Sequence, residues 1–563
     1  MSPPRPMRLT RRHWLAGTTA ALLGSGCRRV DVPDLADVPA RWVGTHPERG
    51  HRLRDALAIS KAGSWPAPAR HGRAGALVLG GGIAGLAAMR ALVARGITDA
   101  RLLELADEPG GNSRGHTLAG LACPLGAHYL PVPQPPAYEV IEWLHEIGLL
   151  RTDPLTRRTV PDERHLVHAP AERLFIDGAW QAGLLPSADG HPATAAQYRR
   201  FAAEVDTARR TLGFSLPTHR SPWTAGHAAL DAQTFATWLR AQGFDDERLL
   251  AYLDYACRDD YGAGLATVSA WAGLHYFASR HGFDPGPDAD GRPAPGQTEE
   301  ADDATHGVFT WPEGNAWLAR QLAAPHAAEG RLLTGRTVCR VDLNRHDVQV
   351  WAWDERAGHM ETWTAPLVIV ALPLFIAQRI LTNPPPALTA AARHARYAPW
   401  LVANLHLDGP LADRPGVPPA WDSVAHAPAG SSTALGYVDA GHQAMNPARQ
   451  ATVLTAYHAL PESQRAALLS EPAATWALRV TRGLADTLHP DLPLRLRAVE
   501  LTRHGHAMRI PAPGVRTAAE RTGLHAGRGR VRFVHADVAG FSVFEEAFSL
   551  GALAGGGGPQ RGA

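Results

Sequence analysis

The sequence has few cysteines and no long uncharged apolar run. Its four cysteines, Cys27, Cys123, Cys257 and Cys339, are widely separated and form no C-x-x-C pair. That spacing indicates neither a disulfide framework nor a zinc site. The longest apolar run without charge extends from Leu15 to Gly26, about half of the ~20 residues that a membrane-spanning helix requires. A run of this length is typical of the core of a signal peptide.

The chain also lacks an excess of positive or of negative charge. The chain has 56 Lys and Arg residues against 54 Asp and Glu residues, a formal net charge of +2, and 45% apolar residues. This balance excludes a strongly basic nucleic-acid binder and a disordered chain, and it favours a globular enzyme. A length of 563 residues predicts two structural domains that together can bury a large cofactor. Lys61 is the only lysine.

The N-terminal segment combines a basic motif with the apolar run. Arg11 and Arg12 are followed by Trp14 and Leu15, which resembles a twin-arginine export signal. The resemblance implies export to the periplasm of a protein already folded around its cofactor, with the twin-arginine machinery as a partner. The alternative is a basic N-terminus on a membrane anchor. The run ends at Cys27 in a sequence that loosely resembles a lipobox, so a lipid tether through Cys27 stays open.

A glycine-rich turn follows a short apolar segment at residues 76–79. Gly80-Gly81-Gly82-Ile83-Ala84-Gly85 leads into an apolar helix pattern that ends before Gly96. Gly80 allows a tight turn, Gly82 lets the backbone approach a pyrophosphate, and Gly85 lets the helix pack closely on the strand. The free N–H groups at the start of such a helix bind phosphate. The pattern predicts a dinucleotide-binding fold.

A second predicted strand at residues 101–105 carries an acidic residue. Glu104 lies 24 residues after Gly80, where a carboxylate accepts hydrogen bonds from the ribose of an adenine nucleotide. An arginine there would indicate a 2′-phosphate, so the glutamate argues against NADP. FAD and NAD both remain open on this evidence.

The residues after Glu104 resemble one enzyme superfamily. Gly110-Gly111-Asn112-Ser113 is similar to the segment that flavin amine oxidases, phytoene desaturases and protoporphyrinogen oxidases carry at this place. The resemblance implies that the glycine pair lies against FAD. Where the superfamily usually has arginine, this chain has Asn112.

Three later segments extend the resemblance in the same order along the chain. Gly126 and Ala127 match a segment beside the flavin, Val338 matches the position that holds adenine through its backbone, and Asp537 matches a residue at the ribityl chain. The implied fold class is α/β, with a Rossmann-like FAD-binding domain of the glutathione reductase type and an interleaved α+β substrate domain. The helix after Asp537 would begin near the pyrimidine end of the flavin and stabilise negative charge there.

The predicted organisation follows from these segments. We expect a signal peptide, a linker or arm, three parts of the FAD-binding domain alternating with two parts of the substrate domain, and a disordered tail, at residues 1–30, 31–74, 75–155, 156–304, 305–375, 376–500, 501–555 and 556–563.

No catalytic residue stands out in the sequence. Trp271 and His275 lie one turn apart in an aromatic helix pattern, and His504 and His506 precede the last FAD segment. These histidines are weak catalytic candidates, because buried aromatic helices usually only pack and two histidines do not make a metal site. No metal is therefore expected, and the flavin is the only evident source of chemistry.

The resemblance implies an FAD-dependent oxidoreductase that transfers a hydride from a C–H bond of a small organic molecule to flavin. Oxygen or a membrane quinone would take the electrons. Many amine oxidases of the family place a lysine near the flavin, but Lys61 precedes the predicted fold. Desaturation of a lipid-like substrate therefore stays open as an alternative to amine oxidation. The alternatives from a different class are FAD binding without turnover and flavin-dependent isomerisation.

Overall fold

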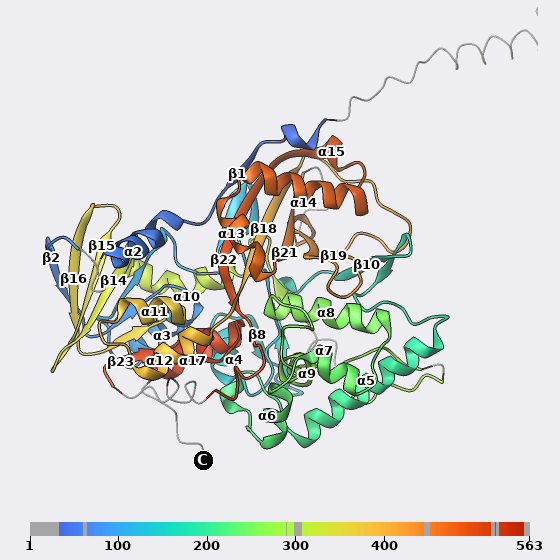
Figure 1. The fold of residues 1–563 in the computed structure, drawn as a ribbon, viewed down its shortest axis with the longest axis horizontal. Helices are drawn as coiled ribbons and strands as arrows, with labels where there is room; N and C mark the ends of the chain where they lie inside the picture. Colours follow the sequence, from blue (N-terminus) through green and yellow to red (C-terminus); the bar gives the residue numbers. More distant parts are fainter. Residues whose placement is uncertain are drawn as a thin grey trace, which may run out of the picture.

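The computed structural model describes residues 33–59, 65–288, 290–297, 307–443, 451–518, 524 and 529–556. Figure 1 shows a smaller lobe with the nucleotide-type sheet, a long curved sheet at the centre, and a group of helices packed beneath that sheet. The predicted signal peptide with Cys27 lies outside the described residues, as does the predicted tail beyond Gly556.

The smaller lobe is built around a parallel five-stranded sheet. Its order is β13-β4-β3-β17-β23, and the strands are Leu332–Thr334, Arg101–Glu104, Leu77–Leu79, Val368–Val370 and Val531–Phe533. All neighbouring pairs are parallel. Numbered along the chain, this is the order 3-2-1-4-5 of a Rossmann-like fold. The predicted α/β fold class is confirmed.

A second sheet packs beside the first. Its order is β14-β15-β16-β2, with bounds Arg336–Leu343, Val348–Asp354, His359–Ala365 and Arg70–Arg73. The first three strands form an antiparallel meander, and β2 joins its edge in parallel. Part of the segment expected to be a linker or arm therefore adds an edge strand to this lobe.

The large sheet has eight strands of mixed direction. Its order is β1-β22-β18-β21-β20-β19-β10-β11, and the bounds are Ala40–Trp42, Leu496–Arg509, Tyr397–Leu407, Thr452–Ala459, Ala434–Asp439, Asp422–Ala425, Glu172–Ile176 and Ala179–Ala182. β1 pairs in parallel with β22 and β10 in parallel with β19, and the other neighbours are antiparallel. Three two-stranded sheets complete the strands: β5–β6 (Gly115–Leu118, Leu121–Pro124), β7–β12 (Tyr129–Pro131, Val308–Thr310) and β8–β9 (Leu150–Thr152, Thr159–Pro161).

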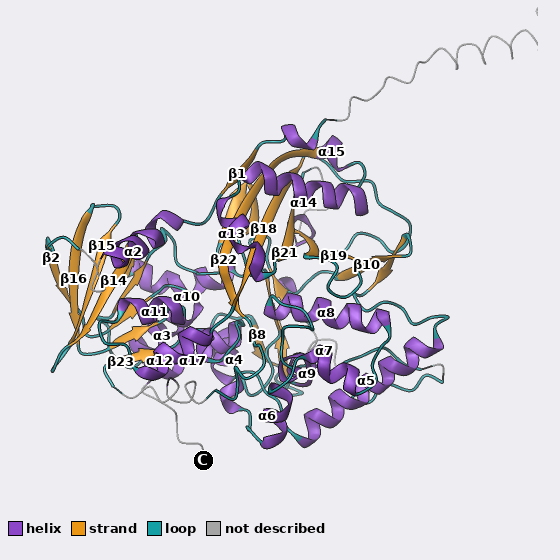
Figure 2. Cartoon of the chain, viewed as in Figure 1, coloured by secondary structure: helices purple, strands orange, loops and turns teal. Residues whose placement is uncertain are grey.

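The helices fall into three groups (Figure 2). Around the parallel sheet are α2, α3, α4, α10, α11, α12 and α17 (Pro47–Ile59, Ile83–Ala94, Tyr138–Glu146, Ala316–Ala328, Leu374–Ile380, Pro386–His394 and Phe544–Gly556). Beneath the large sheet are α5 to α9 (Pro192–Thr211, Ala225–Asp231, Phe235–Ala241, Glu247–Tyr261 and Ala270–Ala278). Above it are α13, α14 and α15 (Arg465–Ser470, Ala473–Thr487 and Leu492–Arg495).

Strand β18 shows why the large sheet has helices on both faces. Every residue from Tyr397 to Leu405 is buried, and successive side chains of a strand point to opposite faces. Val402 accordingly belongs to the core with α5 to α9, whereas Leu401 and Ala403 belong to the core with α14. Because both faces are apolar, the strand needs cover on both sides.

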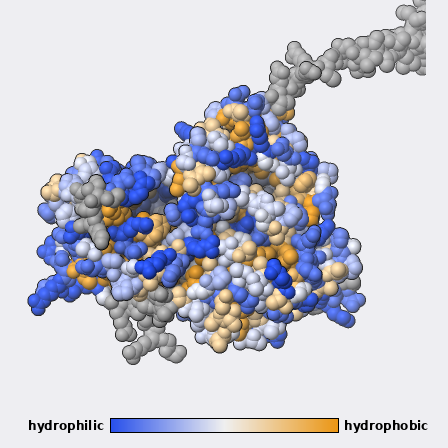
Figure 3. Space-filling view, viewed as in Figure 1, coloured by the Kyte–Doolittle hydropathy of each residue, from blue (hydrophilic) through white to orange (hydrophobic). Residues whose placement is uncertain are grey.

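No helix among the described residues combines the length and apolarity of a membrane span. On the face drawn in Figure 3, hydrophilic and apolar residues alternate in small areas.

Candidate functional site

The glycine turn between β3 and α3 has the geometry that the sequence pattern requires. Gly80 has a φ of +100°, a value that favours glycine. A Cβ added to Gly85 would lie 1.9 Å from the carbonyl oxygen of Gly80, so only glycine lets α3 start this close to the strand. The helix begins at Ile83, followed by Ala84, and its N-cap residue Gly82 makes no side-chain capping bond. The first N–H groups of α3 therefore lack a side-chain cap and can bind an anion.

The predicted glycine pair lies against this turn. The Gly110 N–H donates to the Gly81 oxygen at 2.7 Å. A Cβ added to Gly82 would find only the Cα of Gly111, at 3.9 Å, so there is open space over this glycine contact. Uncapped N–H groups beside bare backbone fit the pyrophosphate of a dinucleotide.

Glu104 ends β4 beside the same turn. Its carboxylate accepts the N–H groups of Gly81 at 2.6 Å and Ala106 at 2.7 Å. Desolvation raises the pKa of Glu104, partly offset by these two hydrogen bonds and by Arg114. Arg114, which the sequence analysis missed, also donates from Nε to the Gly111 oxygen at 3.1 Å. Related proteins have an arginine at the position of Asn112, so the arginine two residues later in this sequence could have indicated the contact.

The next predicted segment passes under strand β22 of the large sheet. The Ala127 N–H donates to the Asn112 oxygen at 2.8 Å, which places the two predicted stretches side by side, and Ser113 is buried. The Asn112 side chain donates to the Ala507 oxygen at 2.7 Å. His504 Nε2 lies 2.8 Å from the Leu125 oxygen, so His504 holds the segment that contains Gly126 rather than facing solvent.

Val338 and Asp537 follow the two edge strands of the parallel sheet, β13 and β23. Val338 is buried in β14. Just before this strand, the Gly335 N–H donates to the Ala106 oxygen. Asp537 is 1% exposed, and its carboxylate accepts the Tyr397 hydroxyl at 2.5 Å and the Leu374 N–H at 3.1 Å. Burial alone would raise the pKa of Asp537, but the His535 ring, Arg509 and Tyr397 bring it to about 2.

The other two histidine candidates differ in exposure. His275 is 0% exposed, stacks on Trp271 at 4.7 Å and bonds through Nε2 to the Ser215 oxygen at 3.1 Å. Burial lowers the pKa of His275 to about 3. His506 is exposed, its ring centroid lies 4.7 Å from that of Phe375, and partial desolvation lowers its pKa to about 4. The structure thus places His275 in the helical core and His506 beside the Tyr397–Asp537 contact.

A cluster that the sequence analysis missed lies between α8, α9 and the large sheet. We call it the acid–aromatic cluster, and its members are Tyr129, Glu172, Tyr252, Tyr255, Asp259, Tyr276, Asp422 and Tyr457. It begins at the predicted flavin segment, because the Tyr457 hydroxyl donates to the Gly126 oxygen at 3.0 Å. The Tyr129 hydroxyl donates to Asp259 Oδ2 at 2.8 Å.

The acids of this cluster are desolvated but not sealed in the core. Glu172 is exposed, and Asp259 and Asp422 are half-buried. Desolvation by the elements around them still raises the pKa of Glu172 to about 7, that of Asp259 to about 6, and that of Asp422 well above its ordinary range. We call the place between α8, α9 and the large sheet, where neighbouring elements desolvate these partly accessible acids, the recess. The periodicity of Tyr252, Tyr255 and Asp259 on α8 was the one local signal for it.

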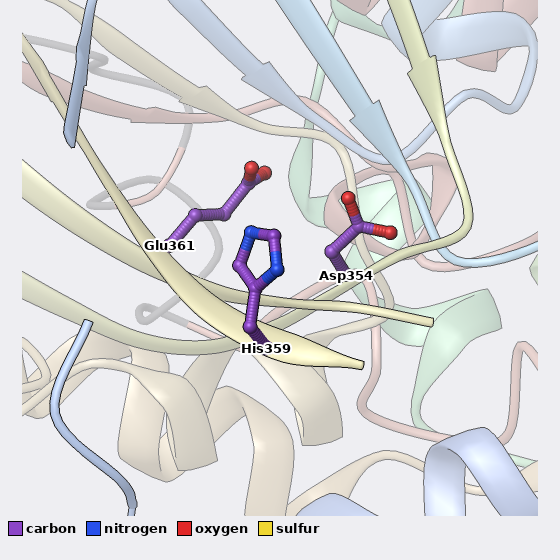
Figure 4. Close-up of side chains that lie close together, drawn as sticks. All are labelled: Asp354, His359 and Glu361. Atoms are coloured by element: carbon purple, nitrogen blue, oxygen red, sulfur yellow. The ribbon is translucent and has the colours of Figure 1, made fainter. Parts of the chain in front are cut away.

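A second group of polar residues lies on the β15–β16 hairpin. Asp354, His359 and Glu361 place one ligand atom each within 4.8 Å of one another (Figure 4). Arg336 already lies 2.7 Å from Asp354 and 3.1 Å from Glu361, so its guanidinium supplies the positive charge that a metal ion would bring. We therefore assign no metal to this hairpin.

The comparisons with known proteins agree with this geometry. The family model "Flavin containing amine oxidoreductase" matches residues 83–551. No curated protein matches the chain. Among solved structures, putrescine oxidase bound to putrescine has a TM-score of 0.61 at 17% identity, covering 86% of this chain and 98% of that one. Cyclohexylamine oxidase from Brevibacterium oxydans has a TM-score of 0.59 at 16% identity, with 86% and 98% covered. A fatty acid isomerase from P. acnes has a TM-score of 0.55 at 13% identity, with 85% and 97% covered.

Proposed function

The chain belongs to the flavin-containing amine oxidoreductase family and is an FAD-dependent oxidoreductase, and we propose that its substrate is an amine. When bound, the flavin accepts a hydride from the carbon next to the substrate nitrogen. The residues of the chain bind the cofactor, orient the amine and exclude water.

The acid–aromatic cluster is the observation that carries this proposal. It begins at Gly126, beside the predicted flavin segment, through the Tyr457 hydroxyl. Carboxylates attract an ammonium group, and aromatic faces stabilise a cation within about 6 Å of the ring centroid. Asp259 binds Tyr129 through Oδ2, which leaves Oδ1 to accept an ammonium N–H. His128, stacked on Tyr457 at 4.4 Å, adds a flat wall next to the flavin segment.

The same charges argue against an anionic lipid. The carboxylate of a fatty acid would enter a recess in which desolvation, Glu172 and Asp259 already raise the pKa of Asp422, and like charges without a counter-ion repel at low dielectric. Amine oxidation is therefore favoured over fatty-acid isomerisation and over desaturation of an acidic lipid. A chain that binds FAD without turnover would have no need of this recess.

Anaerobic reduction of the bound flavin tests the proposal. The purified holoprotein is mixed with octylamine, octan-1-ol or octanoate, which share a chain length and differ in the head group. We expect octylamine alone to bleach the flavin band near ~450 nm. Bleaching by the alcohol or octanoate and not by the amine would refute amine oxidation, and so would a flavin that no primary, secondary or cyclic amine reduces.

The electron acceptor is proposed to be oxygen or a membrane quinone. Stoichiometric peroxide release in air-saturated buffer indicates oxygen. Rapid reoxidation by a soluble quinone with little peroxide indicates a quinone.

Export is proposed on the N-terminal motif. Arg11, Arg12, Trp14 and Leu15 resemble a twin-arginine signal, and this route suits an enzyme that takes up FAD before it leaves the cytoplasm. We expect a periplasmic protein, with a lipid on Cys27 as a possible tether. Changing both arginines to lysine should retain the flavoprotein in the cytoplasm. Labelling with a fatty-acid analogue, compared between the natural chain and Cys27→Ser, tests the lipid.

A further inference from the structure

Residues 40–59 connect the large sheet to the smaller lobe, and we call them the strap. At one end β1 pairs with the edge strand β22 of the large sheet, and at the other end α2 lies on the smaller lobe (Figure 1). The strap precedes the residues that the family model matches. Its contacts are therefore not given by the family to which the chain belongs.

The strap contacts the predicted ribose side of the FAD site through Arg49 of α2. Nη1 of Arg49 donates to the Leu105 oxygen at 2.7 Å, and Nη2 donates to both carboxylate oxygens of Asp107 at 3.1 Å. The Arg49 side chain is only 14% exposed. Leu105 directly follows Glu104, the acid predicted to accept the ribose hydroxyls. Arg49 therefore fixes the backbone next to that acid.

The charge of Arg49 also acts on the carboxylate of Glu104. Desolvation raises the pKa of Glu104, and four groups oppose this rise: the N–H groups of Ala106 and Gly81, then the guanidinium groups of Arg114 and Arg49. An ionised carboxylate is a stronger hydrogen-bond acceptor than a neutral one. Arg49 thus favours the form of Glu104 that accepts ribose hydroxyls.

The same strap packs on the predicted flavin segment. Gly44 has a φ of +73°, and a Cβ added there would lie 2.6 Å from Cδ1 of Leu125, the residue before Gly126. The neighbouring Val43 N–H donates to the Leu501 oxygen of β22 at 2.8 Å. Because Gly44 is only five positions before Arg49, a short stretch of chain contacts both segments that are predicted to lie along FAD.

Both ends of the strap are anchored by ion pairs. In α2, Nη2 of Arg52 donates to Glu355 at 3.0 Å, and its guanidinium lies 5.2 Å from the ring centroid of Trp353. In β1, Nε of Arg41 donates to Glu500 of β22 at 2.7 Å. These anchors hold the middle of the strap between the two lobes, on the segments that are predicted to bind FAD.

We propose that Arg49 is a positioning residue for FAD, and that docking of the strap and binding of FAD stabilise each other. The inference rests on the FAD dependence of the chain and is independent of the substrate. Coupling between two binding events is reciprocal. The factor by which the docked strap strengthens FAD binding is therefore also the factor by which FAD strengthens docking of the strap.

Titration of the flavin-free full-length protein with FAD tests the role of Arg49. Arg49→Gln removes the charge and the paired donors, and we expect the Kd for FAD to rise about tenfold. Arg49→Lys keeps the charge and one donor to Leu105, so the Kd should rise about threefold or less. Arg54→Gln is the matched control, because Arg54 lies on the same helix, is 64% exposed and pairs with its neighbour Asp55. The control should leave the Kd unchanged.

The pH dependence of the Kd separates positioning from a merely structural role. Without the charge of Arg49, the pKa of Glu104 should rise further, since only Arg114 and the two N–H groups still oppose desolvation. The loss of affinity in Arg49→Gln should therefore be larger at pH 5.5 than at pH 8, whereas Arg49→Lys should show a constant loss. A lower melting temperature of flavin-free Arg49→Gln with an unchanged Kd for FAD would overturn the inference.

Hydrogen exchange on the natural protein keeps the inference testable should a variant not fold. We expect FAD to slow amide exchange in α2 more than in α5, the long helix beneath the large sheet that serves as the internal reference. Where the variants fold, Arg49→Gln should lose this extra protection of α2 and Arg54→Gln should keep it. An equal effect of FAD on α2 and α5, or no effect on α2, would contradict the proposal.

Discussion

The contact between α3 and the glycine turn gives a sharp test of the flavin site. In Gly85→Ala, the new Cβ would lie 1.9 Å from the Gly80 oxygen, and the obstacle is backbone that cannot rotate away. To reach the 3.4 Å of an ordinary contact, the start of α3 must move by about 1.5 Å, and overpacking of this kind costs about 1–3 kcal/mol. The higher helix propensity of alanine offsets this cost by up to about 1 kcal/mol, so the net effect of the substitution is destabilising. The same movement draws the first N–H groups of α3 away from the FAD phosphates, which should weaken FAD binding about tenfold or more.

The matched control is Gly483→Ala. Gly483 lies inside α14, and a Cβ there would meet nothing within 4 Å, so this variant should be as stable as the natural protein or more stable by up to about 1 kcal/mol. Thermal unfolding of both variants with bound flavin, and titration of the flavin-free proteins with FAD, measure the two effects. A Gly85→Ala protein that binds FAD with unchanged affinity and unfolds like the control would show that α3 does not approach the turn in this way.

Three further predictions follow from the contacts described. Glu104→Gln keeps the shape of the side chain but loses the negative charge that the Gly81 and Ala106 N–H groups share; FAD should bind about tenfold more weakly in a reconstitution titration, because hydrogen bonds to charged groups contribute about 1.5–3 kcal/mol. The pKa of Asp537 is about 2 in the folded protein, against an ordinary value of 3.8. At pH values above 3.8 its ionised carboxylate therefore stabilises the folded state by about 2 kcal/mol, and this contribution is lost as the pH falls from 4 to 2. Asp537→Asn should be less stable than the natural protein at pH 7, and the difference should shrink steeply in acid unfolding at pH 3. The pKa of Glu172 is raised to about 7 from an ordinary value of 4.5, so ionisation of this side chain opposes folding as the pH rises between these values. Without substrate, Glu172→Gln should melt at a higher temperature than the natural protein at pH 8 and at the same temperature at pH 4.5.

The nucleotide-binding half of the fold could be predicted because its signals are local. Gly80 has a positive φ and Gly85 lies against the Gly80 oxygen five residues earlier, and the acid at Glu104 follows at a fixed distance along the chain. The structure brings the glycine turn together with Gly110 and Gly111, in keeping with the family resemblance of that segment. Order along the chain also predicted that later segments return to the same sheet.

The acid–aromatic cluster could not be predicted in the same way. Glu172 and Asp422 are 250 positions apart, and their neighbourhood depends on the register of two strands in a mixed sheet, which no local pattern specifies. The contact of Tyr129 with Asp259 likewise depends on the packing of α8 against the flavin segment. The strands at residues 40–42 and 70–73 were missed because edge strands of three or four residues carry too little alternation to be recognised.

The packing of the helical region shows what the aromatic face with Trp271 and His275 contacts. Trp271 and His275 do lie on one face of α9, but that face is turned to Phe541 and Phe214. The sequence of an aromatic helix face does not show whether that face packs in the core or contacts a substrate. The tyrosines that border the recess are instead on α8 and at Tyr276, the residue of α9 next to His275.

Anaerobic mixing of the purified holoprotein with octylamine tests the central claim most directly. The account predicts bleaching of the flavin band near ~450 nm by the amine and none by octanoate. A flavin that no amine reduces, or one that octanoate or a polyene reduces instead, would contradict it.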